Sequence, residues 1–172
     1  MKNIVLIGMP GSGKSTTGVL LAKTLLKDFV DTDLLIQTAY GKNLCDLITA
    51  HGLEGFKQLE NDLICQHEFQ NCVVATGGSA VYGKEAMKKL KENGIIVYLK
   101  LSPDDIVGRI QNITTRGIVM PKGCTMEELY AERAPLYEQY ADLTIDCSAL
   151  HVEDCVEAIL KAIQTGVSKD VM

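Results

Sequence analysis

The sequence predicts an α/β fold of three layers, in which a five-stranded parallel sheet carries helices on both faces. One observation behind this prediction is that short apolar segments alternate with longer segments of helical spacing along the whole chain. A second is that the first apolar segment leads into a glycine-rich loop that is followed by a helix. Strands that alternate with helices pair in parallel through right-handed crossovers. A chain of 172 residues is expected to form one domain, over residues 1–172.

Apolar runs, helical spacing and end signals place the individual elements. Continuous apolar runs predict strands at 4–7, 29–31, 72–75, 95–99 and 143–145. Helical spacing predicts helices at 14–27, 34–40, 44–51, 53–70, 84–92 and 152–163. Ser102 and Pro103 open a further helix that fades near 111–112, and Thr125 opens another through a capping box. The stretch 114–123 shows no period, so a mobile loop is expected there.

Composition narrows the possible functions and locations. The net charge of -5 argues against a broad nucleic-acid-binding surface. No apolar run approaches the roughly 20 residues of a membrane span, and the apolar start is cut off by Gly8, too early for a signal-peptide core. The six cysteines form no C-x-x-C pair and no zinc-like spacing, which favours reduced thiols. We therefore expect a cytoplasmic protein without nucleic-acid or membrane partners.

A phosphate-binding loop is the strongest motif. The stretch 8–15 reads G-M-P-G-S-G-K-S, which fits G-x-x-x-x-G-K-[ST] between an apolar strand and a helix. Its glycines let successive backbone N–H groups point at phosphate oxygens, and the helix directs its positive end to the same place. Lys14 would add a charge on the β/γ-phosphates and Ser15 a hydroxyl ligand for Mg²⁺. The motif predicts a P-loop fold that binds ATP through Gly11, Ser12, Gly13, Lys14, Ser15 and Thr16.

Further candidate residues follow two of the strands. Asp31 and Asp33 lie at a strand's carboxyl end, where a pair of acids can serve Mg²⁺ and a substrate hydroxyl. Asp33 could instead cap the helix at 34–40. Gly77-Gly78 follows the third strand and permits close backbone approach to a ligand, or marks an ordinary turn. Arg133 lies within a helix, where by itself it would be interpreted as a solvated residue.

Four features in order resemble the shikimate kinase family, over about residues 4–163. The first is Asp31-Thr32-Asp33, and the second is the stretch 52–60, G-L-E-G-F-K-Q-L-E, which is similar to the family's G-x-x-x-F-R-x-x-E. The third, T-G-G-S-A-V at 76–81, is similar to the family's glycine triplet. The fourth is Arg116 followed by R-A-P-L-Y at 133–137, similar to R-x-P-x-Y. The resemblance implies a nucleoside-monophosphate-kinase type of fold, with a substrate-binding helical segment at about 33–62 and a lid at about 112–124.

The resemblance also implies an activity, the ATP-dependent phosphorylation of a hydroxyl of shikimate, which yields shikimate 3-phosphate and ADP with Mg²⁺ as cofactor. Asp31 and Ser15 would hold the Mg²⁺ shell, and Asp33 would bind the acceptor hydroxyl and take its proton. The implied catalytic residues are Lys14, Asp33 and Arg116, with Arg116 carried in by the lid and Arg109 touching the nucleotide. The implied substrate-binding residues are Asp33, Lys57, Gly77, Gly78 and Arg133.

Three positions depart from the family pattern and leave other functions open. Lys57 stands where the family has arginine, so the charge stays but the planar fork that grips a carboxylate is lost. Ser79 replaces the third glycine, and Gly117 replaces the lid proline, which should loosen the hinge. A kinase for another small hydroxy acid or an amino acid is therefore an alternative. A non-catalytic ATP-binding module and a nucleoside monophosphate kinase are further ones. A monomer is expected.

Overall fold

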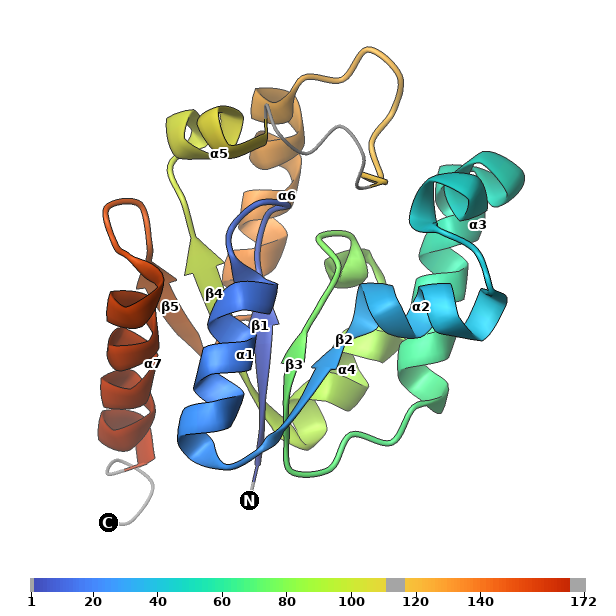
Figure 1. Cartoon of the computed structure of the whole chain (residues 1–172). Helices are drawn as coiled ribbons and strands as arrows, with labels where there is room; N and C mark the ends of the chain where they lie inside the picture. Colours follow the sequence, from blue (N-terminus) through green and yellow to red (C-terminus); the bar gives the residue numbers. More distant parts are fainter. Residues whose placement is uncertain (1, 111–116, 168–172) are drawn as a thin grey trace.

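The computed structural model describes residues 2–110 and 117–167, and its centre is a five-stranded parallel sheet (Figure 1). The strand order is β2-β3-β1-β4-β5. The strands are β1 Asn3–Ile7, β2 Asp28–Asp31, β3 Cys72–Ala75, β4 Gly94–Lys100 and β5 Leu143–Asp146. In register, Val5 of β1 lies between Val74 of β3 and Ile96 of β4. The predicted three-layer α/β fold is confirmed.

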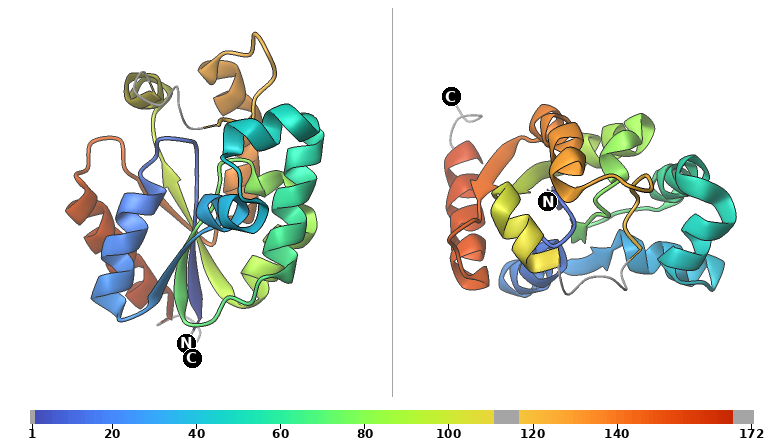
Figure 2. Two further views of the ribbon diagram at one scale, coloured as in Figure 1. Left: turned by 45° about the vertical axis from the view of Figure 1, so that its right-hand side comes forward. Right: turned by 90° about the horizontal axis from the view of Figure 1, so that it is seen from above.

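Helices cover both faces of this sheet (Figure 2). Those on the face of α1 are α1 Lys14–Leu25 and α7 Val152–Val167, which pack against each other. The opposite face carries α4 Lys84–Glu92 and α6 Met126–Tyr140, with the 3₁₀ turn η1 Ala80–Tyr82 beside them. The remaining helices lie toward the carboxyl ends of the strands and are α2 Thr32–Tyr40, α3 Leu44–Gln66 and α5 Pro103–Ile110. Both layers bury their apolar side chains against strands such as β1, all of whose residues are buried.

Most predicted end signals are confirmed. The Thr125 side chain accepts from the backbone of Glu128, whose carboxylate accepts in return, so the capping box opens α6. Gly52 breaks the helical conformation inside α3 with φ 70° and ψ 177°, so the predicted pair of helices at 44–51 and 53–70 forms one kinked element. The second of these predictions was too long, because His67 is extended and ends α3.

The first predicted helix, 14–27, was also too long. Leu26 adopts φ 54°, a left-handed conformation, and its N–H bonds back to carbonyls of the last turn of α1. Leu26 is an unusual residue for this position, because the left-handed region favours glycine or asparagine. Nothing in the local pattern marks this end, so the sequence alone favours a helix that continues to Lys27.

A second, smaller apolar cluster lies beside the main core. Its buried members come from α2, α3 and the segment before α6, and they are Ile36, Leu44, Leu47, Phe56 and Val119. Val119 thus packs the segment before α6, residues 117–125, which we call the covering segment, against α2 and α3. Gly117 lies close to the start of α3, since a Cβ there would lie 2.9 Å from the backbone nitrogen of Cys45 and 3.0 Å from Leu44 Cβ. This close approach to α3 explains why residue 117 is a glycine. That Gly117 loosens the hinge of the lid stays a prediction.

In the part of the chain that the structure describes, no helix has both the length and the apolar character needed to cross a membrane.

Candidate functional site

The loop between β1 and α1 adopts a conformation that requires its glycines. Gly8, Gly11 and Gly13 have φ values of 148°, 80° and 86°, a region that other residues rarely occupy. A Cβ on Gly8 would also lie 2.7 Å from the carbonyl oxygen of Leu99. The loop turns back through a bond from Ser12 N to Met9 O of 3.1 Å and opens α1 at Lys14. Backbone N–H groups at this helix start form an anion-binding end.

Lys14 is held inside the loop. Its Nζ donates to the carbonyl oxygens of Gly8 and Met9, both at 2.8 Å, and to Ser12 Oγ at 3.3 Å. Burial lowers the pKa of Lys14 to about 8, while the charge of Asp33 acts in the opposite direction. The cation is therefore fixed where the P-loop would receive phosphate groups.

Asp31 connects the phosphate loop to the next helix. Its Oδ2 accepts from Ser15 Oγ at 2.7 Å, and its Oδ1 accepts from the backbone N–H of Asp33 at 2.9 Å and of Leu34 at 3.3 Å. Asp31 is thus the N-cap of α2, and the alternative in which Asp33 caps that helix is wrong. The carboxylate and the hydroxyl are hard oxygen donors of the kind that Mg²⁺ prefers. The side chain of Asp33 lies by the turn after β3, because a Cβ on Gly77 would be 2.7 Å from its Oδ1.

Gly77 and Gly78, which follow β3, lie between two carboxylates and the guanidinium group of Arg133. A Cβ on Gly77 would lie 2.5 Å from Glu60 Oε1 and 2.7 Å from Asp33 Oδ1. A Cβ on Gly78 would lie 2.9 Å from Arg133 Nη1 and 3.0 Å from Pro10 Cδ. Only glycine fits where these groups converge, so the close approach predicted for this pair is present.

Glu60 is a buried carboxyl group that sequence reasoning did not include among the site residues. It is 1% exposed, and its Oε2 accepts from Ser79 Oγ at 2.5 Å. Burial raises its pKa to about 7, against the opposing effect of the Ser79 hydrogen bond. A signal was available, because Glu60 shares one helix face with the buried Phe56 and Ile64, four residues before and after it.

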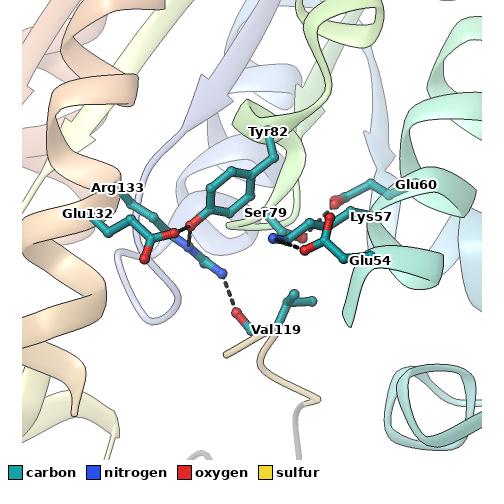
Figure 3. A network of polar contacts seen from close by, with 8 residues as sticks. All are labelled: Glu54, Lys57, Glu60, Ser79, Tyr82, Val119, Glu132 and Arg133. Atoms are coloured by element: carbon teal, nitrogen blue, oxygen red, sulfur yellow. Dashed lines mark hydrogen bonds and ion pairs between the residues drawn. The ribbon is translucent and has the colours of Figure 1, made fainter. Parts of the chain in front are cut away.

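Arg133 of α6 is buried, which corrects its interpretation as a solvated residue when taken alone. It is 1% exposed, its Nη2 donates to the carbonyl oxygen of Val119, and its Nε donates to Tyr82 Oη at 3.3 Å. Its guanidinium carbon lies 5.3 Å from the centre of the Tyr82 ring (Figure 3). The hydroxyl of Tyr82 in turn donates to Glu132. This network links Arg133 of α6 to Val119 of the covering segment and to Tyr82 of η1.

Lys57 lies on the other side of the Tyr82 ring. Its Nζ pairs with Glu54 Oε1 at 2.8 Å and lies 4.2 Å from the ring centre (Figure 3). Its side chain is 23% exposed. Two cations therefore flank one aromatic ring, but Lys57 is engaged by an acid of its own helix.

The phosphate loop, the start of α2, the glycine turn after β3 and Arg133 line a cavity of about 410 Å³. Predicted nucleotide-binding residues that line it are Gly11, Gly13, Lys14, Ser15 and Thr16. Predicted metal-binding and acceptor residues that line it are Asp31, Asp33, Gly77, Gly78 and Arg133. Ser12 is buried within the loop, whereas Lys57 and the exposed Arg109 are not among the lining residues. Arg116 lies outside the described residues.

Gly77→Ala should destabilise the protein by about 1–3 kcal/mol, because the new methyl group would overlap two carboxylate oxygens. Urea denaturation followed by circular dichroism measures this change. The matched control is Gly108→Ala in α5, where a Cβ meets nothing within 4 Å and should be neutral or stabilising. Equal stability of the two variants would contradict the crowding described at Gly77.

Comparisons with known proteins agree with this geometry. The family model described as shikimate kinase matches residues 10–164. A shikimate kinase of Caldanaerobacter subterraneus is 36% identical over 165 residues, covering 94% of this chain and 96% of its own length. A shikimate kinase of Thermodesulfovibrio yellowstonii is 38% identical over 164 residues, covering 94% of each chain.

Solved structures show the same likeness. The shikimate kinase of Acinetobacter baumannii in complex with shikimate superposes with a TM-score of 0.87 at 28% identity, covering 96% of this chain and 94% of that one. The shikimate kinase of Aquifex aeolicus gives a TM-score of 0.81 at 27% identity, with 96% and 98% covered. Sequence and fold therefore point to one family.

Proposed function

The chain belongs to the shikimate kinase family, and we propose that its site transfers the γ-phosphoryl group of ATP to a hydroxyl of shikimate, giving shikimate 3-phosphate and ADP. The observation that carries the proposal is that a glycine-rich phosphate loop, the acid Asp33 and the buried cation Arg133 line a single cavity. Such a cavity can hold a triphosphate and a small hydroxy acid together. Its chemistry would be in-line transfer, driven by positioning and charge neutralisation.

On the nucleotide side, backbone N–H groups of the loop would bind the phosphates, and Lys14 would exchange its loop carbonyls for phosphate oxygens. Ser15 and Asp31 would hold Mg²⁺, since their oxygens already lie 2.7 Å apart beside the loop. The bound metal supplies neutralisation of phosphate charge. Arg116 from the lid at 112–124 and Arg109 from α5 are proposed to reach the nucleotide as well.

On the acceptor side, Asp33 would orient the reacting hydroxyl and accept its proton, because its carboxylate lies beside the Gly77 backbone on the cavity wall. Arg133 would bind the carboxylate of the acceptor through its planar fork. Gly77 and Gly78 would allow the acceptor to lie close to the backbone. Closure of the lid would exclude water and so suppress hydrolysis of ATP.

A related kinase for a different small hydroxy acid or an amino acid is the second candidate. The observation that favours it is the position of Lys57, which is bound to Glu54 and is not among the residues that line the cavity. To bind an acceptor carboxylate together with Arg133, Lys57 would have to leave Glu54. A non-catalytic ATP-binding module is less consistent with Asp33 and Arg133 converging beside the loop. A monomeric state and a cytoplasmic location stay predictions.

An acceptor panel tests the proposed function. ADP release is measured with MgATP and each of shikimate, quinate, other small hydroxy acids and hydroxyl-bearing amino acids. We expect turnover with shikimate far above the ATPase rate that is measured without acceptor. Turnover with another acid and none with shikimate would replace the proposed substrate, while no stimulation by any acceptor would favour a binding module.

Arg133→Lys should raise the acceptor KM by about 30-fold and leave the ATP KM within about twofold. Lysine keeps the charge but loses the two-pronged hydrogen bond to a carboxylate, a loss of about 2 kcal/mol. Steady-state kinetics with each substrate varied in turn gives both constants, and circular dichroism confirms folding. An increase confined to the ATP KM would place Arg133 on the nucleotide side instead.

A further inference from the structure

Ser79 lines the cavity, and Glu60 lies behind it and is not among the lining residues; the two form a buried pair. The serine donates its hydroxyl to Glu60 Oε2 at 2.5 Å, and the two residues are 4% and 1% exposed. Ser79 has φ −89° and ψ −7°, and this negative φ does not call for glycine. A residue with a side chain is therefore accommodated at this position, and the partner of its hydroxyl in the structure is the Glu60 carboxyl group.

The lysine nearest to Glu60 in sequence does not bind it. Lys57 lies three residues after Glu54 and three before Glu60, so it could pair with either acid on the α3 surface. In the structure it pairs with Glu54 and lies over the Tyr82 ring (Figure 3). Within residues 2–110 and 117–167, no lysine or arginine forms an ion pair with Glu60. The hydrogen bond from Ser79 is thus what fixes the carboxyl group.

The second oxygen of Glu60 points toward the acceptor side. Glu60 Oε1 is buried and has no hydrogen-bond partner among the described residues. It lies close behind Gly77, on whose Cα an added Cβ would sit 2.5 Å from it and 2.7 Å from Asp33 Oδ1. A buried acceptor oxygen without a partner costs free energy. Its placement directly beside the group assigned to the acceptor hydroxyl suggests a role in the reaction.

We propose that Ser79 is a positioning residue for the acceptor side: its hydroxyl fixes the Glu60 carboxyl behind Gly77, where the charge of Glu60 acts on Asp33 and Arg133. This inference rests on the proposed function, because it assigns those two residues to the acceptor. Ser79 lines the cavity, but its hydroxyl is donated to Glu60 and is not assigned to a substrate. It acts through Glu60, which holds its second oxygen in one place only while the hydrogen bond persists.

The charge of Glu60 is sensitive to this hydrogen bond near neutral pH. Burial and, to a smaller extent, the charge of Asp33 of α2 raise the pKa of Glu60, which comes to about 7. The Ser79 hydroxyl, Arg133 of α6 and Lys14 of α1 act in the opposite direction. A donor to the carboxylate stabilises the charged form, so removing the hydroxyl raises the pKa and leaves Glu60 neutral over a wider pH range.

Carbon-13 NMR of glutamate side-chain carboxyl groups tests the pair without reference to activity. The Glu60 signal, assigned through its loss in Glu60→Gln, should titrate near pH 7 in the wild type. In Ser79→Ala its midpoint should rise by roughly one pH unit, the effect of losing a hydrogen bond to a charged group. Ser79→Gly should match Ser79→Ala, and Ser79→Thr, which keeps the hydroxyl, should restore the wild-type midpoint.

Kinetics of the same variants test the role in the reaction. Ser79→Ala should raise the acceptor KM by roughly fivefold and leave the ATP KM unchanged. The low-pH limb of the pH profile of kcat/KM for the acceptor should move to higher pH, by the same amount as the Glu60 midpoint measured by NMR. In a Glu60→Gln background, Ser79→Ala should no longer move the limb, since the two residues act as one unit.

Each outcome has a separate meaning. An unchanged NMR midpoint in both Ser79→Ala and Ser79→Gly would overturn the proposal, even in a fully active kinase. A shifted midpoint with an unchanged acceptor KM and pH profile would also overturn it, because the pair would then be structural only. If the wild type phosphorylates no acceptor, the proposed function fails, and NMR still decides whether Ser79 controls Glu60.

Discussion

Lys14→Met should reduce kcat/KM for ATP by about 10³-fold. The ammonium group is fixed inside the loop by the carbonyl oxygens of Gly8 and Met9, so it is preorganised where charge develops on the transferred phosphoryl group. Methionine keeps much of the buried side-chain length but supplies no charge and no donor. The measurement is steady-state ADP release in the presence of shikimate.

The control for this prediction is Lys23→Met, which removes an exposed lysine from the last turn of the same helix. It should leave kcat/KM within about twofold, since an exposed charge at this distance is screened by solvent. Thermal unfolding of both variants separates loss of folding from loss of chemistry. A folded Lys14→Met protein with more than a tenth of wild-type kcat/KM would show that the lysine is not the phosphate-binding cation.

Asp33→Asn should lower kcat by roughly 10²-fold or more while changing the ATP KM little. Asparagine has the same shape, but it cannot accept the proton of the acceptor hydroxyl, and positioned general bases typically contribute at least this factor. The carboxylate lies beside Gly77 on the cavity wall, whereas Asp31 is already engaged by Ser15 and the start of α2. The two acids therefore have different tasks.

Asp28→Asn is the matched control, since Asp28 is an exposed acid at the start of β2, the strand that leads into α2. It should keep wild-type kcat. Single-turnover measurements with saturating ATP and acceptor show whether the chemical step has slowed. An Asp33→Asn variant with an unchanged chemical step would contradict a role for this acid in accepting the proton of the acceptor hydroxyl.

Local features of the chain were predictable because their signals are local. The phosphate loop carries its glycines at positions that need positive φ, and the sequence places them between an apolar strand and a helix. The strand β3 and the helix α4 agree with their predicted bounds, and the capping box marks the start of α6. Each of these depends on neighbours within a few residues, so pattern and physical chemistry suffice.

The acceptor side was less predictable because it is made by tertiary packing. The burial of Arg133 depends on Val119 and Tyr82, which lie 14 and 51 residues away in sequence. Lys57 could have paired with Glu54 or Glu60, and the ring of Tyr82 from η1 lies beside the lysine that pairs with Glu54. Likewise, the partnership of Glu60 with Ser79 spans 19 residues and joins α3 to the turn after β3. No local pattern encodes these choices.

Phosphorus-31 NMR of the complete reaction shows whether the γ-phosphoryl group of ATP reaches shikimate or water. The protein is incubated with MgATP and shikimate, and the products are identified by their resonances. We expect one phosphomonoester, shikimate 3-phosphate, in equal amount to the ADP formed and with little inorganic phosphate. Release of ADP together with inorganic phosphate alone, at the same rate with and without shikimate, would contradict this expectation.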